Sequence, residues 1–267
     1  MHYRHHFHAG NFADVFKHVL LIGLLEALSR KPAPWCYLDT HAGSGRYDLG
    51  AAPADATGEA KDGIARIADV ADAPAWVARY LALVRASPYY PGSPAIGAAL
   101  ARDTDRVVCC EKQPYIAEQL RHNVPEATVH VRSGYEAASL LPPKEKRGLV
   151  LIDPPFEARD EFDRMADLIQ RCLQRFAGGV YAAWHPLKNR HEAERFARRV
   201  ARDAARPALV ATLDTGAKGE GQMRSCGMLV VNPPFGFDTA ATDVLAWLTP
   251  RLAQGSRPSF ALEPVGA

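Results

Sequence analysis

The sequence lacks any long hydrophobic run. Its longest apolar stretch covers residues 19–25, far short of the ~20 residues that a membrane-spanning helix needs. At the N-terminus, four histidines and an arginine precede any apolar stretch, which is unlike a secretion signal. The five cysteines are an odd number without CxxC spacing, which argues against a disulfide framework and a zinc ribbon. We therefore expect a protein of the reducing cytoplasm.

The net charge of the chain is also small. The 32 basic and 30 acidic residues leave a formal charge of +2, so the charge balance alone indicates no particular partner. Arginine supplies 24 of the 32 basic residues. Its planar group suits phosphates and bases, but an arginine- and alanine-rich composition explains the same count.

The chain has no internal repeat, and its 267 residues suit one large domain or one domain with an insertion. Short apolar runs that end at Asp, Glu or Gly alternate with helical stretches, which predicts an α/β fold with a parallel sheet. The expected parallel strands cover residues 35–38, 106–110, 128–131, 149–152 and 179–184. The expected helices cover residues 12–29, after a cap at Asn11, 114–122 and 161–175.

Two regions depart from this alternation. Residues 208–213 and 228–231 are separated by a glycine-rich loop without a helix, so they are predicted to be an antiparallel pair. Residues 47–104 are predicted to be a mostly helical insertion subdomain, with the main domain formed by residues 1–46 and 105–267. Within the insertion we expect helices at about 62–70 and 74–86 and a turn at 90–94, and we expect the tail after Gly255 to be loosely held.

Glycines and polar residues follow three successive expected strands. Gly43 and Gly45 follow the first strand, where they let the backbone approach a ligand closely. Their spacing is neither GxGxxG nor GxxxxGK[ST], which disfavours a dinucleotide cradle and excludes a P-loop. Glu111 ends the next strand, where an acid can accept hydrogen bonds from both ribose hydroxyls, although an acid at a helix N-terminus would stand there for structural reasons too. With Ser133 and Gly134, which are placed to meet an adenine ring, these strand ends predict a site for S-adenosylmethionine.

The tetrapeptide Asp153-Pro154-Pro155-Phe156 follows the next buried strand. Its two prolines fix the loop and remove two N–H donors. An exocyclic amine has two N–H donors, of which Asp153 can accept one and the Pro154 carbonyl the other, while Phe156 stacks on the base. These two hydrogen bonds would direct the amine lone pair at the methyl group of a sulfonium. Methyl transfer then depends mainly on the correct orientation of the two reactants. The tetrapeptide therefore predicts N-methylation of a base amine; the alternative is a proline-terminated strand with a loop aspartate.

A second tetrapeptide, Asn232-Pro233-Pro234-Phe235, has the same pattern and follows residues 228–231. It comes after the expected antiparallel pair, where no cofactor-binding strand end is expected. Asp153 is therefore the preferred catalytic candidate.

Five segments, YRHHFHAGNFADVFKH, YLDTHAGSGRYDLG, YYPGSP, LVLIDPPFE and SCGMLVVNPPF, resemble the RlmJ family of bacterial 23S ribosomal RNA (adenine-N6)-methyltransferases. The resemblance runs in the same order from Tyr3 to about Trp247. It implies a Rossmann-like methyltransferase fold: a seven-stranded, mostly parallel sheet, an antiparallel pair near the C-terminus and a small helical insertion. It also implies S-adenosylmethionine as methyl donor and an adenine of 23S ribosomal RNA, naked or partly assembled, as acceptor. We expect a monomer.

The resemblance also implies roles for particular residues. The cofactor-binding residues would be His18, His41, Gly43, Ser93, Glu111, Ser133, Gly134 and Asp153. Asp153, Pro154 and Phe156 would be catalytic, with Asp153 as the acceptor, while Tyr3 and Arg4 would contact the RNA. The chain departs from the family pattern where the family often has Asp-Gly in place of Ser133-Gly134, and where we expect Tyr in place of Phe156.

Three alternatives stay open. The tetrapeptide is expected to contact the base amine and not the sugar, so a DNA adenine-N6 or a guanine-N2 methyltransferase could contain the same tetrapeptide. A non-catalytic RNA-binding protein that retains the cofactor fold is a rival of a different class. The histidines near the N-terminus could suggest a metal site, but no cysteine lies close to them and the proposed chemistry needs no metal, so we expect none. Lys17 and Arg46 could contact phosphate, although solvated surface charges are the default interpretation.

Overall fold

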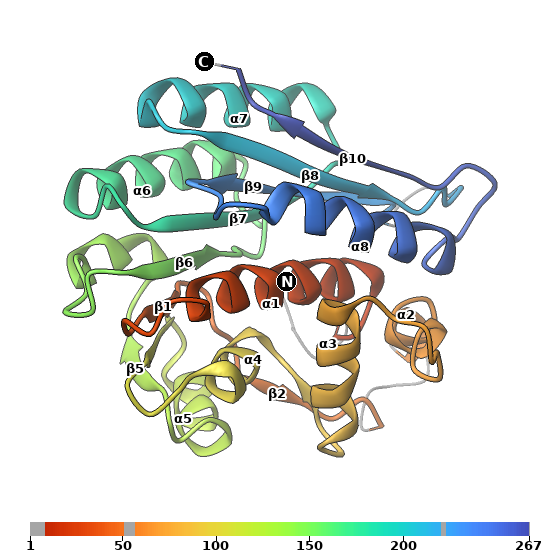
Figure 1. Ribbon diagram of the computed structural model, residues 1–267, viewed down its shortest axis with the longest axis horizontal. Helices are drawn as coiled ribbons and strands as arrows, with labels where there is room; N and C mark the ends of the chain where they lie inside the picture. Colours follow the sequence, from red (N-terminus) through yellow and green to blue (C-terminus); the bar gives the residue numbers. More distant parts are fainter. Residues whose placement is uncertain (1–8, 51–56, 220–222, 267) are drawn as a thin grey trace.

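The computed structural model describes residues 9–50, 57–219 and 223–266. Its main sheet has eight strands in the order β10-β8-β9-β7-β6-β1-β4-β5 (Figure 1). The strands are β1 Cys36–Asp39, β4 Arg106–Glu111, β5 Thr128–Val131, β6 Gly148–Ile152, β7 Val180–Pro186, β8 Ala208–Asp214, β9 Ser225–Val231 and β10 Ser259–Pro264. β5, β4, β1, β6 and β7 run parallel, and β9 is antiparallel to both β7 and β8. The predicted α/β class, parallel strands and antiparallel pair are confirmed.

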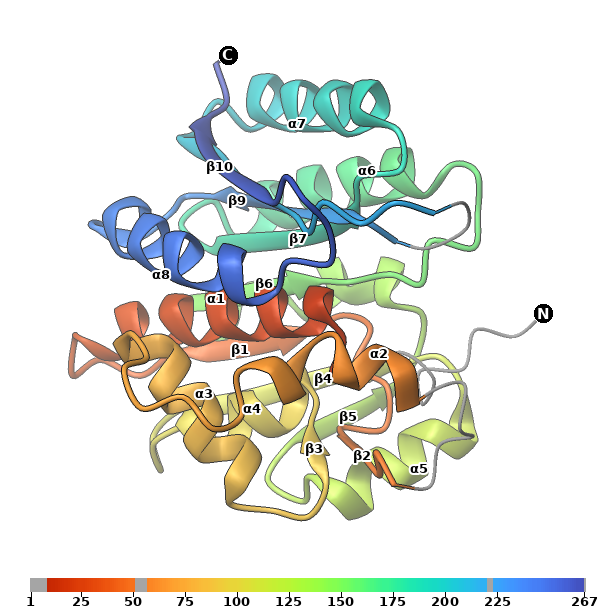
Figure 2. The ribbon, with the colours of Figure 1, turned by 90° about the vertical axis from the view of Figure 1, so that its right-hand side faces the viewer.

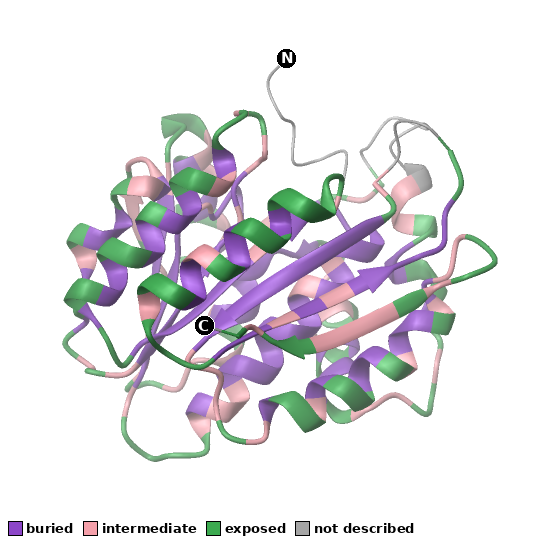
Figure 3. Ribbon diagram, turned by 90° about the horizontal axis from the view of Figure 1, so that it is seen from above, coloured by how far each residue is buried: buried purple, intermediate pink, exposed green. Residues whose placement is uncertain are grey.

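Helices cover both faces of this sheet (Figures 1 and 2). One face carries α1 Phe12–Ser29, α3 Ala75–Arg85, α4 Ser93–Leu100, α5 Pro114–Asn123 and α8 Phe237–Arg251. The other carries the 3₁₀ segment η3 Gly134–Leu140, α6 Glu161–Arg175 and α7 Arg190–Ala204. Each layer buries its own hydrophobic core against the sheet, and the central strands are buried whereas β10 is partly exposed (Figure 3).

The helix α1 is apolar on nearly all sides because it lies between the sheet and other helices. It contacts β6 and β9 on one side and α3, α4 and α8 on the others. A helix that is hydrophobic all round is a buried one. Its start is fixed by Asn11, whose side-chain oxygen accepts a hydrogen bond from the Asp14 N–H at 2.9 Å, as the sequence predicts.

The sheet has one strand more than expected, because the C-terminal tail is not loose. β10 pairs in antiparallel register with β8, so that Ser259 lies opposite Asp214 and Pro264 opposite Leu209. Phe260 and Leu262 pack on the core from alternate positions of this strand. The prediction of a loosely held tail is wrong, and the alternation of apolar residues was the signal for an edge strand.

The segment between β1 and β4 also contains β structure. β2 Arg46–Tyr47 and β3 Tyr90–Pro91 form a separate two-stranded antiparallel sheet, and α4 begins at Ser93, within the predicted turn. Of the helix expected at about 62–70, the structure contains only the short 3₁₀ segment η2 Ile64–Arg66, and the short helix α2 Thr57–Lys61 precedes that range. α4 packs on β1 and β4. The subdomain boundaries at residues 47 and 104 stay a prediction.

Strand order reverses between β1 and β6. From β1 the chain proceeds outward to β4 and β5, and it then returns to β6 and β7 on the other side of β1. In open α/β sheets, ligands bind outside the carboxyl ends of the strands at such a reversal. None of the described helices is long and apolar enough to span a membrane.

Candidate active site

A pocket opens at the carboxyl ends of β1 and β6, where strand order reverses. Its walls come from the start of α1, the loop after β1, the start of α4, the loop after β6 and the end of β7. The lining residues are Ala9, Asn11, Ala13, Asp14, Lys17, His18, His41, Ala42, Tyr47, Gly92, Ser93, Asp153, Pro154, Pro155, Trp184 and Met223. Five of the predicted site residues are among them, namely His18, His41, Ser93, Asp153 and Pro154.

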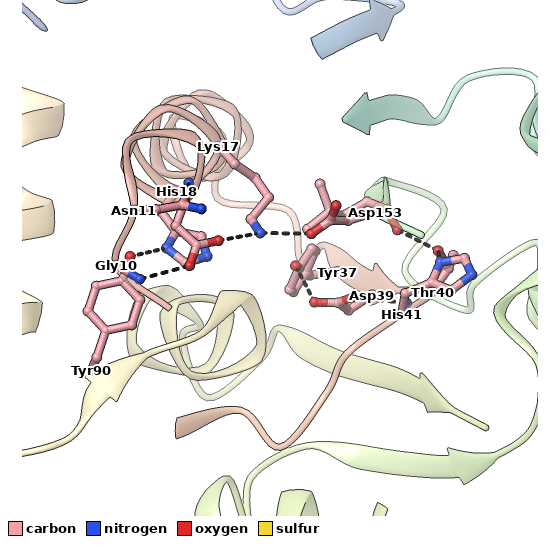
Figure 4. A network of polar contacts seen from close by, with 12 residues as sticks. Gly10, Asn11, Lys17, His18, Tyr37, Asp39, Thr40, His41, Tyr90 and Asp153 are labelled. Atoms are coloured by element: carbon pink, nitrogen blue, oxygen red, sulfur yellow. Dashed lines mark hydrogen bonds and ion pairs between the residues drawn. The ribbon is translucent and has the colours of Figure 1, made fainter. Parts of the chain in front are cut away.

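Lys17 ties the diproline turn to α1 (Figure 4). Its Nζ donates to Asp153 Oδ2 at 2.7 Å and to Asp14 Oδ1 at 2.8 Å. The Lys17 side chain is only 12% exposed, so the surface default for Lys17 is wrong. Asp14 is fixed in turn by the Gly10 N–H, which donates to its Oδ2 at 3.0 Å. One buried cation therefore bridges two carboxylates from segments far apart in the sequence.

The charges of this network stabilise one another. Burial alone would lower the pKa of Lys17, but the two carboxylates outweigh it and hold the pKa well above its usual range. Burial would raise the pKa of Asp14, but Lys17 and the hydrogen bonds to it bring the pKa down to about 2. Lys17 and Asp14 are therefore both ionised at neutral pH.

His18 lies one residue further along α1 and is buried. Burial lowers the pKa of His18 to about 3, so the ring is neutral at physiological pH. Its Nδ1 lies 3.1 Å from the hydroxyl of Tyr90, which lies 2.7 Å from the hydroxyl of Tyr80. Since Tyr80 is on α3 and Tyr90 on β3, this polar chain joins the pocket to the segment between β1 and β4.

Asp39, at the end of β1, holds the loop that follows it. Its carboxylate accepts hydrogen bonds from the Tyr37 hydroxyl at 2.8 Å and from the His41 N–H at 3.2 Å. Burial raises the pKa of Asp39 to about 6, against hydrogen bonds from Ser93 and Tyr37 that lower it. Ser93 therefore reaches the pocket with its side chain oriented by Asp39.

The glycine loop and the end of β4 meet directly. Glu111 Oε2 accepts the Gly43 N–H at 3.1 Å, and Glu111 Oε1 accepts the Gln113 N–H at 2.8 Å. Gly43 and Gly45 have φ values of 61° and 77°, which favour glycine. Each carboxylate oxygen of Glu111 keeps a further lone pair, because such an oxygen can accept about two hydrogen bonds.

Ser133 and Gly134 begin η3 beside the same loop. The Ser133 hydroxyl accepts the Tyr135 N–H at 3.3 Å and caps η3. A side chain at Gly134 would place a Cβ 2.1 Å from the Thr40 carbonyl oxygen and 2.7 Å from the His41 ring, so only glycine fits. The start of η3 therefore lies against His41, which itself lines the pocket.

Phe156 is placed differently from the expectation that it stacks on a base. Its ring is not among those lining the pocket; it meets the Phe162 ring at 5.2 Å and the Trp184 ring at 6.0 Å, both edge to face. Its φ of 51° is strained for a bulky residue. Trp184 does line the pocket, as does Pro155. No sequence signal singled out Trp184, because a tryptophan near the end of an apolar strand reads as core.

Six of the described candidates are not among the residues that line this pocket, namely Gly43, Arg46, Glu111, Ser133, Gly134 and Phe156. Tyr3 and Arg4, together with the N-terminal histidines, lie outside the described residues. The Arg46 Nε donates to the Asn123 carbonyl at 2.9 Å, away from the pocket lining. Among the described residues, no group of three or more His, Cys, Asp or Glu side chains could hold a metal ion.

The second tetrapeptide lies at the opposite ends of the strands from the pocket. β9 is antiparallel to β7, so Val231 lies opposite Tyr181, near the start of β7. The Asn232 amide donates to the carbonyls of Ala177 and Gly179 at 3.0 and 2.8 Å. These amide contacts are structural, in line with the preference for Asp153.

Comparison with known proteins fits this geometry. The family described as "Ribosomal RNA large subunit methyltransferase D, RlmJ" matches residues 32–261. The chain belongs to this family. It is 38% identical to "Ribosomal RNA large subunit methyltransferase J" of Haemophilus influenzae over 98% of this chain and 97% of that one, and 38% identical to the Escherichia coli protein of the same name over 94% and 93%. A solved Legionella pneumophila structure superposes with a TM-score of 0.87 at 33% identity, covering 96% of this chain and 98% of that one.

Proposed function

We propose that this protein transfers a methyl group from S-adenosylmethionine to N6 of an adenine in 23S ribosomal RNA. The observation that carries the proposal is the placement of the diproline turn. Asp153 and Pro154 line the pocket where strand order reverses, next to the loop that Glu111 holds. Membership of the RlmJ family supports a large-subunit ribosomal RNA as the substrate. The proposal includes action in the cytoplasm, as a monomer.

The residues around the pocket suit the proposed cofactor. The two remaining lone pairs on Glu111 match the two hydroxyls of a ribose. Ser133 and Gly134 adjoin His41 and are proposed to meet the adenine ring, while His18, His41 and Ser93 are proposed to line the amino-acid part. When bound, S-adenosylmethionine supplies a methyl group on a positively charged sulfur.

Asp153 and the Pro154 carbonyl are proposed to accept the two N–H groups of the target amine. This hold fixes the direction of the amine lone pair, and methyl transfer to a positioned amine needs orientation above all. Lys17 keeps the Asp153 carboxylate in place through the 2.7 Å ion pair. Because methylation replaces one amine hydrogen, one proton leaves the amine, and the Asp153 carboxylate that accepts this N–H is positioned to take the proton up.

We assign the aromatic contact with the base to Trp184 and not to Phe156. Trp184 lines the pocket, whereas the Phe156 ring contacts the rings of Trp184 and Phe162 edge to face. Aromatic rings hold an extruded base by stacking, worth ~1–3 kcal/mol per base. Phe156 then braces Trp184 and the turn. Tyr3 and Arg4 stay proposed RNA contacts.

The proposal is tested by mass spectrometry of ribosomal RNA from cells with and without this protein. We expect one N6-methyladenosine of 23S RNA to disappear when the protein is absent and to return with the purified enzyme and S-adenosylmethionine. Matched RNA and DNA hairpins that carry the same target sequence separate the substrate classes. Methylation of the DNA hairpin alone, of guanine N2, or of neither hairpin would contradict the proposal.

A further inference from the structure

A second, shallow hollow lies on the flank of the molecule, away from the pocket. It is formed by the residues that follow β5, by η3 and by the C-terminal half of α6. Three arginines line it, Arg132, Arg171 and Arg175, and the one acid among its lining residues is Glu136. The hollow therefore carries an excess of positive charge on a chain whose net charge is only +2.

The three guanidinium groups are oriented by neutral oxygens. Arg132 Nη1 donates to the Ser139 hydroxyl at 2.7 Å, and Arg175 Nε donates to the Leu141 carbonyl at 2.7 Å. Arg171 donates from Nη2 to the Tyr135 carbonyl at 2.8 Å and from Nε to the Asp167 carbonyl at 3.3 Å. Each contact uses one or two of five N–H donors, so each group keeps donors for an anion.

These arginines differ from Arg198, Arg199 and Arg202 of the neighbouring helix α7. On α7, Arg198 pairs with Glu194, Arg202 with Asp203, and Arg199 with Asp163 and Asp167. No ion pair joins Arg132, Arg171 or Arg175 to a carboxylate within the part of the chain that the structure describes. Their charge is thus held in position without being neutralised. A fixed, uncompensated guanidinium suits the bidentate geometry of a phosphate.

The hollow is connected to the pocket through Tyr135. The Tyr135 ring meets the ring of His41, which lines the pocket, at 5.1 Å edge to face. The Tyr135 carbonyl accepts from Arg171 in the hollow, and Arg164 lies over the Tyr135 ring at 4.0 Å. A chain seated in the pocket can therefore continue past Tyr135 along the flank.

We propose that this hollow binds the phosphate backbone of the RNA substrate outside the target nucleotide. The inference rests on the proposed function for the identity of the RNA and goes beyond it by assigning a docking surface. Phosphate contacts fix register and orientation and carry no sequence information. Arg132, Arg171 and Arg175 would each contact backbone phosphates of a strand that leaves the pocket beside Tyr135.

The test replaces all three arginines by glutamine in the full-length protein, Arg132→Gln, Arg171→Gln and Arg175→Gln together. The matched control removes the same charge from α7 by Arg195→Gln, Arg198→Gln and Arg202→Gln. For both, the dissociation constant for a 23S RNA fragment is measured as a function of salt, beside kcat, KM and S-adenosylmethionine affinity.

We expect the hollow variant to bind RNA about 10- to 100-fold more weakly at 0.1 M salt. The slope of log affinity against log salt should fall by about 2, since each single-strand phosphate contact contributes ~0.7. KM should rise with kcat and cofactor affinity within about twofold, and the α7 control should match the unaltered protein. If the triple variant does not fold, Arg171→Gln and Arg175→Gln singly should each lower the slope by about 0.7.

Several results would overturn the inference. An unchanged slope and dissociation constant, or equal losses in the hollow variant and the α7 control, would leave the hollow without a specific role. Loss of kcat or cofactor affinity with RNA binding intact would make these arginines structural supports of the pocket. Competition by polyglutamate as effective as that by RNA of equal charge would show a site for any polyanion. Failure of the unaltered protein to methylate RNA that it binds would instead refute the proposed function, because the salt slope is measured without turnover.

Discussion

The chain contains the same tetrapeptide pattern at two places, and the two copies lie at opposite ends of the strands of one sheet. The turn at residues 153–156 follows the parallel strand β6 and faces the pocket. The turn at residues 232–235 follows β9, which runs the other way, and ends with Phe235 97% exposed to solvent. The direction of the preceding strand therefore decides which copy can take part in chemistry.

The two turns also hold their strained residue differently. Each has one non-glycine residue with a positive φ, 51° at Phe156 and 54° at Asn232. Asparagine tolerates this conformation, whereas a bulky aromatic does not. At the pocket the strained backbone conformation is that of Phe156, and the contacts of its ring with Phe162 and Trp184 hold it in place. Strain that is held by surrounding contacts is a known feature of functional sites.

The largest expected difference is in catalysis. Asp153→Ala removes the proposed acceptor of an amine N–H, so kcat should fall at least ~100-fold, while the affinity for S-adenosylmethionine should change little because Glu111 and the glycine loop are untouched. Asn232→Ala leaves kcat unchanged, although it should lower the free energy of unfolding by about 1–2 kcal/mol because two amide hydrogen bonds are lost. Steady-state kinetics and cofactor titration of both variants make the measurement. Equal losses of kcat would show that the turns do not differ in function.

A second difference is in the pH dependence of stability, because the ring of Phe156 in the pocket turn is linked through Phe162 to the buried His185. The rings Phe156, Phe162, His185 and Phe196 follow one another at 5.2, 5.7 and 5.8 Å. Burial lowers the pKa of His185 to about 4. An unfolded histidine takes up a proton below about pH 6.5, so the unfolded state binds more protons than the folded state between pH 6.5 and 4. Stability is thus lost as pH falls through that window.

His185→Leu should remove this contribution. Between pH 7 and pH 5 the unaltered protein should lose about 2 kcal/mol more stability than the variant, from 1.36 kcal/mol for each pH unit of the window. His191→Gln, at an exposed position of α7, serves as the control and should follow the unaltered protein. Urea unfolding at both pH values makes the comparison. A His185→Leu variant with the full pH dependence would place its origin elsewhere, for example at the buried His18.

Local sequence patterns predicted the core strands and helices well, since each of these elements has a hydrophobic pattern, a cap or a turn of its own. The cap at Asn11, the apolar run of β6 and the diproline turn all act within a few residues. The features that were missed depend on partners distant in sequence. β2 pairs with β3 across more than forty residues, and β10 is stabilised by β8.

The same reason explains what was missed in the pocket. From the sequence alone, Lys17 was expected to be a surface charge. The fold places its Nζ 2.7 Å from Oδ2 of Asp153, which is 136 residues away in the sequence. Phe156 looks like a stacking residue until its positive φ turns its ring toward Phe162 and Trp184. The residue types in the sequence were enough to predict the kind of reaction. Which side chain has which role in the pocket depends on contacts between segments that are distant in sequence.

The smallest expected difference concerns the two phenylalanines. Phe156→Ala removes two edge-to-face ring contacts, so the free energy of unfolding should fall by about 1–2 kcal/mol. The value of kcat/KM should fall as well, because Trp184 and the turn lose their brace. Phe235→Ala removes an exposed ring and should change stability by less than about 0.5 kcal/mol, with kcat/KM unchanged. Urea denaturation and kinetics of the two variants measure this difference. A Phe235→Ala variant as unstable as Phe156→Ala would mean that packing does not distinguish the two turns, and that strand direction alone separates them.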